Sequence, residues 1–316
     1  MAIEEKVRSI GDLPVQHARA PNTQAAERAR FFNSGNAFNI KLPEVPNAVF
    51  VAEPQRALAP ETPTGFIACD ASAEMHCPFP ATTPLILARY GRIRAGETLE
   101  ANFNATGVIH YVIEGRGTTA LDGETIEWAP GDIFIAPGGQ VARHKAGSED
   151  AVLWVVSNEP LLAFENLRAP DAASGRPTDL VHYTADEIRR QIDLLYEIDQ
   201  DENVAGMALV MSSDKQQAGR NVLPSLTLAM NTLAPGAVQR AHRHNSVAVS
   251  LVIQGHKCFS TIDGERKDWA PWATTITPPT SVHSHHNDGS ERALFLIVQD
   301  GGLYYHARAM GFAFVD

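Results

Sequence analysis

The 316-residue sequence predicts an all-β protein made of two antiparallel β-barrel (jelly-roll) domains, with a few peripheral helices. The first observation behind this prediction is a period of two. Apolar and polar residues alternate in short runs, broken by Gly, Pro and Asp-Gly, from Pro84 to about Ser157 and again from Leu226 to about Gln299. Such alternation with frequent turns is typical of antiparallel strands.

The second observation is an internal repeat. The phrase VIEGRGTTALDGETIEWAPGDIFIAP, starting at Val112, returns as VIQGHKCFSTIDGERKDWAPWATTITP, starting at Val252. The glycines, the Asp-Gly pairs and the Trp-Ala-Pro triplets of the two phrases correspond at an offset of 140 to 141 residues. All-β chains tend to close their sheets into barrels or sandwiches, so the repeat predicts two copies of one barrel.

The repeat divides the chain into four predicted parts. They are an N-terminal arm with a helix (1–84), a first barrel (85–168), a helical linker (169–220) and a second barrel (221–316). With 44% hydrophobic residues, each barrel is expected to have a core of its own.

Helices are predicted only outside the barrels. In the arm, the sequence NTQAAERARFFN indicates a helix around Asn22 to Asn33 with Asn22 as its cap. The proline-rich stretch from Leu42 to Pro80 favours extended segments that lie over a barrel or across a subunit contact. In the linker, Thr184 and Glu187 form a capping box that opens the helix IRRQIDLLYEID.

The composition favours some classes of binding partner and argues against others. A formal charge of −11 argues against a nucleic-acid surface, which needs clustered Lys and Arg, and favours small-molecule partners. There is no apolar run of about 18 residues, and the N-terminus lacks the order of a signal peptide, so neither a membrane span nor secretion is expected. Cys69, Cys77 and Cys258 suit free thiols. The expected compartment is the cytoplasm.

Histidines distinguish the two copies. His242 and His244 are two residues apart on a predicted strand, so both side chains lie on one face, and His283 follows Pro278 where a closed sheet can return it to the pair. The corresponding residues of the first copy are Asn102, Asn104 and Ala142, which leaves that barrel without the ligands. The sequence therefore predicts a metal site at His242, His244 and His283.

These motifs resemble those of the cupin superfamily, and the repeat makes the chain similar to a bicupin. Gly-x5-His-x-His, Gly255 and Pro278-x4-His283 carry the resemblance. Many cupins add a glutamate ligand where this chain has Ala248. The sequence is similar specifically to gentisate 1,2-dioxygenase, salicylate dioxygenase and 1-hydroxy-2-naphthoate dioxygenase. The resemblance implies a three-histidine Fe(II) site, cleavage of a hydroxylated aromatic acid with O₂, and a homodimer or homotetramer.

Two features depart from those enzymes. They keep their iron in the first cupin domain, whereas the histidines here lie in the second. They commonly place an arginine facing the substrate carboxylate where this chain has Ser250. Other groups considered for that carboxylate are Arg240, Arg292, His306 and Arg308, the last two in a C-terminal run that could fold over the barrel mouth.

Further site residues follow from the chemistry. His285 is two residues beyond His283 and is expected to share its face, as a proton carrier or as a group that orients a ligand. His286 is expected to point away. Other residues considered are Trp272 and Phe259 as an apolar wall, and Gln239 and Asn287 as orienting groups.

The sequence leaves other functions open. The chain could be one subunit of a hydroquinone-type dioxygenase, a metal-dependent cupin isomerase or lyase, or a non-catalytic binding bicupin. Three imidazoles with open positions suit non-haem Fe(II) best, although three-histidine zinc sites also exist.

Overall fold

The computed structural model describes residues 8–38, 40–171, 175–198 and 206–315. The chain forms two compact units, Met1–Pro43 and Glu44–Asp316. The described residues of the first unit form a short 3₁₀ helix, η1 (Ile10–Asp12), and a short α-helix, α1 (Gln24–Glu27). The predicted helix from Asn22 to Asn33 is therefore much shorter. Thr23, not Asn22, caps it, because Thr23 Oγ1 accepts a hydrogen bond from the Ala26 backbone N–H at 3.1 Å.

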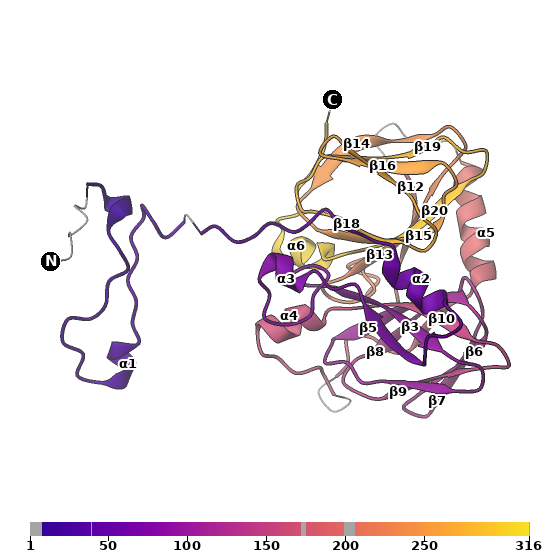
Figure 1. Cartoon of the computed structure of the whole chain (residues 1–316), viewed down its shortest axis with the longest axis horizontal. Helices are drawn as coiled ribbons and strands as arrows, with labels where there is room; N and C mark the ends of the chain where they lie inside the picture. Colours follow the sequence, from indigo (N-terminus) through magenta and orange to yellow (C-terminus); the bar gives the residue numbers. More distant parts are fainter. Residues whose placement is uncertain (1–7, 39, 172–174, 199–205, 316) are drawn as a thin grey trace. The chain divides into compact units, whose positions relative to one another are not determined.

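The second unit contains two β-barrels (Figure 1). Each is built from two facing antiparallel sheets. The first barrel pairs a six-stranded sheet of order β11-β8-β5-β10-β3-β2 with a four-stranded sheet of order β4-β9-β6-β7. Its strands are β2 (Gly65–Ala68), β3 (Leu87–Ile93), β4 (Thr98–Ala101), β5 (Gly107–Glu114), β6 (Gly117–Leu121), β7 (Glu124–Trp128), β8 (Ile133–Pro137), β9 (Ala142–Ala146), β10 (Ala151–Ser157) and β11 (Val181–Tyr183).

The second barrel repeats this plan. Its six-stranded sheet has the order β1-β18-β15-β20-β13-β12, and its five-stranded sheet the order β17-β16-β19-β14-β21. The strands are β1 (Val49–Phe50), β12 (Met207–Met211), β13 (Thr227–Leu233), β14 (Val238–His244), β15 (Ala248–Gln254), β16 (Cys258–Ile262), β17 (Glu265–Asp268), β18 (Thr274–Thr277), β19 (His283–Asn287), β20 (Ala293–Gln299) and β21 (Phe312–Phe314). The predicted all-β class with two jelly-roll-like barrels is confirmed.

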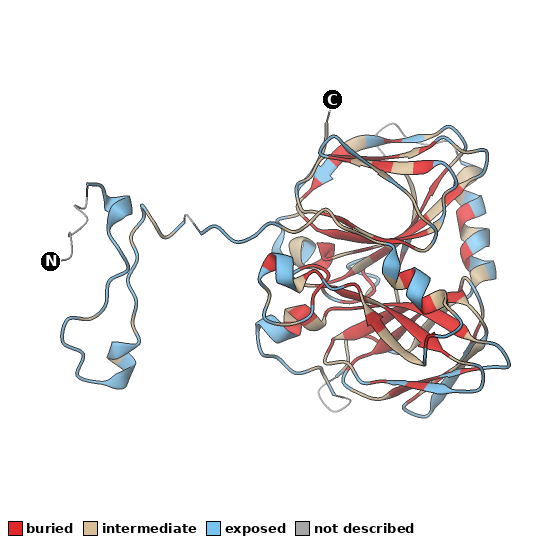
Figure 2. Ribbon diagram, viewed as in Figure 1, coloured by how far each residue is buried: buried red, intermediate tan, exposed pale blue. Residues whose placement is uncertain are grey.

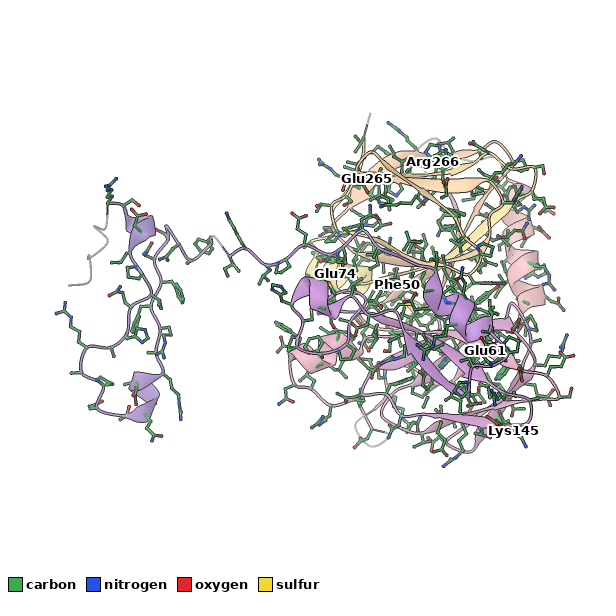
Figure 3. The ribbon with its side chains drawn as sticks, viewed as in Figure 1. Phe50, Glu61, Glu74, Lys145, Glu265 and Arg266 are labelled. Carbon is green, nitrogen blue, oxygen red and sulfur yellow. The ribbon has the colours of Figure 1, made fainter. Side chains whose placement is uncertain are left out.

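The repeated Asp-Gly pairs form the same turn in both barrels. Asp122 and Gly123 have φ angles of 53° and 85°, and Asp263 and Gly264 have 47° and 84°. Two successive positive φ angles describe the type I′ turn, whose twist matches that of the flanking strands. These turns close the hairpins β6–β7 and β16–β17. The side chains of the second hairpin, at Glu265 and Arg266, are labelled in Figure 3.

Segments outside the repeat complete both large sheets. β2 and β12 pair with the corresponding strands β3 and β13, and β11 and β1 pair with β8 and β18. The residues before the first barrel thus supply an edge strand to the second. The domain boundaries after residues 84, 168 and 220, which the sequence predicts, remain a proposal.

The largest core cluster joins the two barrels. It includes Trp154 and Tyr90 of the first barrel and Leu251 and Leu296 of the second, all fully buried. Figure 2 shows buried residues along the strands of both sheets where the barrels meet. Phe50, labelled in Figure 3, packs against this cluster. Smaller hydrophobic clusters lie inside each barrel. The expectation that each barrel has a core of its own is correct for these smaller clusters and wrong for the largest one, which the barrels share.

Helices lie around the barrels. α5 (Ala185–Tyr196) starts where the capping box predicts, since Thr184 Oγ1 accepts from the Glu187 backbone N–H. Asp199, the end of the predicted helix, lies outside the described residues. The remaining helices are α2 (Ala52–Leu58), α3 (Ser72–Met75), α4 (Glu159–Phe164) and α6 (Gly301–Ala307). α2 and α3 interrupt the stretch predicted as extended. Among the described residues, no helix has the length and apolar character to span a membrane.

Candidate metal centre and its cavity

The strand register brings three histidines together inside the second barrel. His242 and His244 lie on β14, where inward residues alternate with exposed ones such as Arg243. β19 runs antiparallel to β14, and His283 on β19 is the direct cross-strand partner of His242. The three side chains are buried, and one ligand-capable atom from each lies within 4.8 Å of the others.

Backbone carbonyls orient all three rings. His242 Nδ1 lies 2.8 Å from the Arg240 carbonyl oxygen, His244 Nδ1 lies 2.8 Å from the Ser246 carbonyl oxygen, and His283 Nδ1 lies 2.9 Å from the Ser281 carbonyl oxygen. A carbonyl can only accept, so each Nδ1 carries the ring proton. Each Nε2 is then left with a free lone pair, which is the arrangement of a metal-ligating imidazole.

Burial keeps these rings neutral. It lowers the pKa of His242 and His244 below the usual value of 6.5, and it lowers the pKa of His283 to about 3. The neighbouring imidazoles add to the effect at His244 and His283, since each disfavours charge on the next. Metal ions bind the neutral form of histidine, so the lowered pKa values leave all three imidazoles in the form that binds a cation.

The geometry fits a divalent ion after a small contraction. Two nitrogens bound at about 2.1 Å to one ion are at most about 4.2 Å apart. The separation of up to 4.8 Å therefore has to shorten by at least about 0.6 Å, and by more where the nitrogens lie on the same side of the ion. Gln299 on β20 also contacts the site, because its Nε2 lies 3.2 Å from His244 Nε2. A metal ion would take over the lone pair that this amide now contacts.

His285 lies beside this group in the same barrel. Its ring centroid is 5.8 Å from that of His283, and it packs at 4.8 Å against Phe295. His285 Nδ1 is 2.8 Å from Ser260 Oγ, which also accepts a hydrogen bond from Trp269 Nε1 at 2.8 Å. Burial, and then the neighbouring His283, lower the pKa of His285 well below its usual value.

The first barrel contains the same network. His144 Nδ1 is 2.8 Å from Thr119 Oγ1, which accepts from Trp128 Nε1 at 2.9 Å. His144 stands 141 residues before His285. The Trp–hydroxyl–His arrangement therefore belongs to the repeated barrel, whether or not the barrel has the three histidines of the second copy.

The first barrel differs at the three ligand positions. β4 ends at Ala101, so Asn102 and Asn104 lie beyond the strand, whereas the corresponding β14 continues through His244. Asn104 bonds to the backbone of the segment after α4, at Leu167 and Ala169. Of the described residues, those that form a three-ligand cluster are His242, His244 and His283.

A cavity of about 480 Å³, the inner cavity, opens onto the histidines. All four histidines contribute to its wall, together with apolar, hydroxyl and amide side chains. Those other residues are Gly206, Ala208, Val210, Thr227, Ala229, Asn231, Gln239, Ser246, Ala248, Ser250, Thr277, Ile297, Gln299, Tyr305, Met310 and Phe312. Its size and lining suit a small aromatic molecule.

Several residues considered from sequence lie elsewhere. Phe259 stacks on His286 at 4.4 Å outside the inner cavity, and Trp272 packs against Tyr111 of the first barrel. The prediction that these two residues form an apolar wall of the site is therefore wrong. Asn287 donates to backbone carbonyls, including that of Leu233, and so supports a loop.

The cations considered from sequence also lie outside the inner cavity. Arg240 covers the Phe314 ring, and Arg292 pairs with Asp193 over the Tyr196 ring. His306 and Arg308 border a second, larger cavity. His286 bonds to Ser284 and points away from the histidine group, as predicted.

Sequence reasoning missed two contacts of the centre. Phe312 on β21 lies 5.3 Å from His242, centroid to centroid, and β21 pairs with β14 along the histidines. Gln299 reaches His244 from β20. The only signal for Phe312 was the expectation that the C-terminal run covers the barrel mouth, and Tyr305, Met310 and Phe312 do line the cavity.

Comparison with known proteins identifies the repeated unit. Residues 90–158 and 229–299 each match the cupin domain family. The salicylate 1,2-dioxygenase of Pseudaminobacter salicylatoxidans superposes with a TM-score of 0.73 at 14% identity, covering 90% of this chain and 92% of the other. This shared fold spans both barrels.

Curated relatives match over shorter stretches. The 5-aminosalicylate 1,2-dioxygenase of a Comamonas species is 32% identical over 81 residues, which are 26% of this chain and 22% of the relative. The gentisate 1,2-dioxygenase of a Ralstonia species is 33% identical over 85 residues, 27% and 24% of the two chains. The 1-hydroxy-2-naphthoate 1,2-dioxygenase of Nocardioides is 36% identical over 80 residues, 25% and 21%. The match thus spans less than a quarter of the length of these relatives.

Proposed function

The chain is a bicupin, and we propose that it is an Fe(II)-dependent dioxygenase that cleaves the ring of a hydroxylated aromatic compound of the gentisate or salicylate kind. The metal site is proposed in the second cupin domain, at His242, His244 and His283. The similarity to three ring-cleaving dioxygenases supports the reaction class.

One observation carries the proposal. Three buried, neutral imidazoles each donate a hydrogen bond from Nδ1–H to a backbone carbonyl, which leaves the Nε2 lone pair free for a metal. The three rings lie close enough to share one ion, and all of them line the inner cavity. Three neutral donors leave a divalent ion with its full charge and with open positions, which resembles the three-ligand sites of non-haem Fe(II) oxygenases with an imidazole in place of the usual carboxylate. A bound Fe(II) would supply the place where O₂ and the phenol meet and the path for electrons from ring to oxygen.

The chain's own residues have separate parts in the proposed reaction. The inner cavity holds the ring beside the histidines, with Ile297 and Phe312 as apolar walls. Tyr305 and Met310 also line this cavity and add apolar surface to its wall. His285 borders the same cavity, and we assign it the transfer of a proton between the phenol and the barrel interior. Ser260 and Trp269 fix its ring.

The test is O₂ uptake by protein loaded anaerobically with Fe(II). Gentisate, salicylate, 1-hydroxy-2-naphthoate, 5-substituted salicylates and hydroquinone are offered in parallel, and the ultraviolet spectrum is followed for a ring-opened product. Uptake with a matching spectral change supports the dioxygenase. Bound metal with no uptake from any phenol contradicts it and favours the isomerase, lyase or binding functions.

Assembly and compartment complete the proposal. We propose a homodimer or homotetramer in the cytoplasm. A row of exposed apolar side chains in the N-terminal unit, from Phe31 through Phe38 to Leu42, supports self-association, and three free cysteines suit a reducing compartment. Sedimentation of the full chain over a range of concentrations tests the assembly, and a monomer throughout that range contradicts it.

A further inference from the structure

The described residues that line the inner cavity give it no fixed positive charge. None of its lining residues, all of them among the described residues, is Lys or Arg, and none is Asp or Glu. The polar groups there are neutral: Ser250, Asn231, Gln239 and Gln299 among them. Gln239 is buried, and its Oε1 has no hydrogen-bond partner among the described residues. A carboxylate placed here away from the metal would lose its hydration without gaining a cation, which is costly.

Positive charge collects in the neighbouring cavity instead. This outer cavity, of about 1080 Å³, lies between the two barrels and α6, and Arg220, Arg308 and His306 line it. None of the described residues that line it is Asp or Glu. In a chain of net charge −11, a cavity lined by two arginines and no carboxylate is suited to an anion.

The arginines are available to a ligand. Both are exposed, and no described carboxylate forms a salt bridge with either of them. Arg308 uses Nη1 to donate to the His306 carbonyl oxygen, which leaves its remaining N–H groups for a ligand. Asp300, which precedes α6, accepts from the Val247 backbone N–H and does not line the cavity.

The two cavities adjoin. Five residues line both of them: Val210, Thr227, Ala229, Gln299 and Tyr305. These five residues stand between the histidines and the arginines, so only a ligand whose substituent is directed past them could contact both groups.

We infer that the substrate is a hydroxylated aromatic whose anionic group is carried on a flexible arm, with the ring in the inner cavity and the anion at Arg220 and Arg308. This inference rests on the proposed function for the ring end. The arm places the charge where the chain supplies cations, and it leaves the neutral inner cavity to the phenol. Charge-assisted hydrogen bonds to the two arginines then contribute to affinity for the arm alone.

The experiment measures binding by calorimetry without O₂, so that no turnover is needed. Hydroquinone, gentisate, 2,5-dihydroxyphenylacetate and 3-(2,5-dihydroxyphenyl)propanoate are titrated into the Fe(II)-loaded full chain, its Arg220→Gln and Arg308→Gln variants, and Arg143→Gln. Arg143 is the matched control, because it is an exposed arginine on the first barrel that pairs with Glu100. We expect an armed acid to bind about ten-fold tighter than hydroquinone. Each cavity variant should lose most of that gain, and hydroquinone should bind within two-fold of the unchanged chain.

Equal weakening of every ligand, or tightest binding of gentisate with no effect of either variant, would overturn the inference. A second titration separates it from the proposed function: 3-phenylpropanoate, which has no hydroxyl, into metal-free protein. Binding that depends on Arg220 and Arg308, with no O₂ uptake from any phenol, contradicts the dioxygenase and keeps the anion site. O₂ uptake that is indifferent to both arginines keeps the dioxygenase and removes the anion site.

Discussion

At the scale of single residues, the duplication provides its own control. The two barrels share the Trp–hydroxyl–His network but differ at the positions of His242, His244 and His283. Residues common to both copies are best explained by the barrel, and residues unique to the second copy by its site. The three histidines belong to the second class. His285 belongs to both, since it occupies a repeated position and also borders the cavity.

Replacing a ligand histidine should abolish metal binding. His242→Ala, His244→Ala and His283→Ala should each lower Fe(II) affinity by more than about 100-fold, because each removes one of three donors. Metal content after loading and gel filtration, measured by elemental analysis, is the readout. Asn102→Ala, at the matching position of the first barrel, should retain the metal. Retention of a full equivalent by any of the three histidine variants would contradict the site.

Substitutions of His285 and His144 should distinguish a structural role of the Trp–hydroxyl–His network from a role in the reaction. Both substitutions to Ala take one partner from a buried hydroxyl, which keeps only its bond from the indole N–H, so both should lower stability by about 1–3 kcal/mol. Only His285→Ala should lower turnover, by about 10²- to 10⁴-fold, with metal still bound. The checks are steady-state kinetics, metal content and thermal unfolding of both variants. Unchanged turnover in His285→Ala would make this residue a packing group in both barrels.

At the scale of elements, β21 distinguishes the second barrel's small sheet from the first's. It adds to the edge of β14, whereas β4 is itself an edge strand within the described part of the first barrel. Its register sets Phe314 opposite His242 and Phe312 opposite His244. The C-terminal strand therefore completes the wall of the inner cavity.

Shortening Phe312 should weaken substrate binding without loss of metal. Phe312→Ala removes an aromatic wall worth about 1 kcal/mol, or roughly five-fold in affinity, and its half-exposed side chain contributes little to folding. Calorimetric titration of a phenol that the loaded protein binds provides the measurement, with Phe259→Ala as the control outside the cavity. Loss of metal in Phe312→Ala would mean that β21 holds the histidines and not the substrate.

The sequence predicted the elements that local chemistry defines. The two Asp-Gly turns, the capping box at Thr184 and the shared face of His242 and His244 all follow from short-range geometry. It could not predict the places of Trp272 and Phe259. Where the barrels meet, an apolar residue such as Trp272 can face a barrel interior or the other barrel with the same sequence pattern. Phe259 lies on β16 of the small sheet, where its ring contacts His286 and Arg266. Nor could spacing reveal Gln299, whose contact with His244 depends on packing between strands.

Asp300 should make stability depend on pH at the junction of β20 and α6. Burial raises the pKa of Asp300 from 3.8 to about 6, so the folded chain binds this proton more tightly than the unfolded chain. That contribution is full below about pH 4 and is lost as the pH rises through about 6. The matching residue, Asn158, accepts from the Thr106 backbone N–H as Asp300 does from Val247. Asp300→Asn should therefore stabilise the protein by about 1–3 kcal/mol at pH 8 and hardly at pH 4.

Urea unfolding of Asp300→Asn and the unchanged chain at both pH values measures this difference. Glu124→Gln on the exposed hairpin β6–β7 is the control and should be neutral at both. An equal change in the free energy of unfolding at pH 4 and pH 8 would show that the carboxyl group is not the cause.

At the scale of the whole molecule, the barrels share a polar contact inside their common core. Trp154 Nε1 donates to Thr274 Oγ1 at 2.9 Å, Thr274 Oγ1 lies 2.7 Å from the Tyr90 hydroxyl, and that hydroxyl donates to the Trp272 carbonyl oxygen. Trp154, Tyr90 and Thr274 are fully buried. Because two first-barrel side chains depend on one hydroxyl of the second barrel, the barrels should unfold together.

Thr274→Val tests that coupling. Valine keeps the shape of threonine but leaves the Trp154 N–H and the Tyr90 hydroxyl with one partner fewer each, which should cost about 2–4 kcal/mol in the free energy of unfolding. Hydrogen exchange resolved by segment should show protection falling by the same amount in β10 and in β20, since both lie in the joint core. Thr125→Val, on the exposed strand β7, should change neither. Loss of protection in β20 with β10 unchanged would mean that each barrel folds on its own, and that the core between them is a contact of two finished domains.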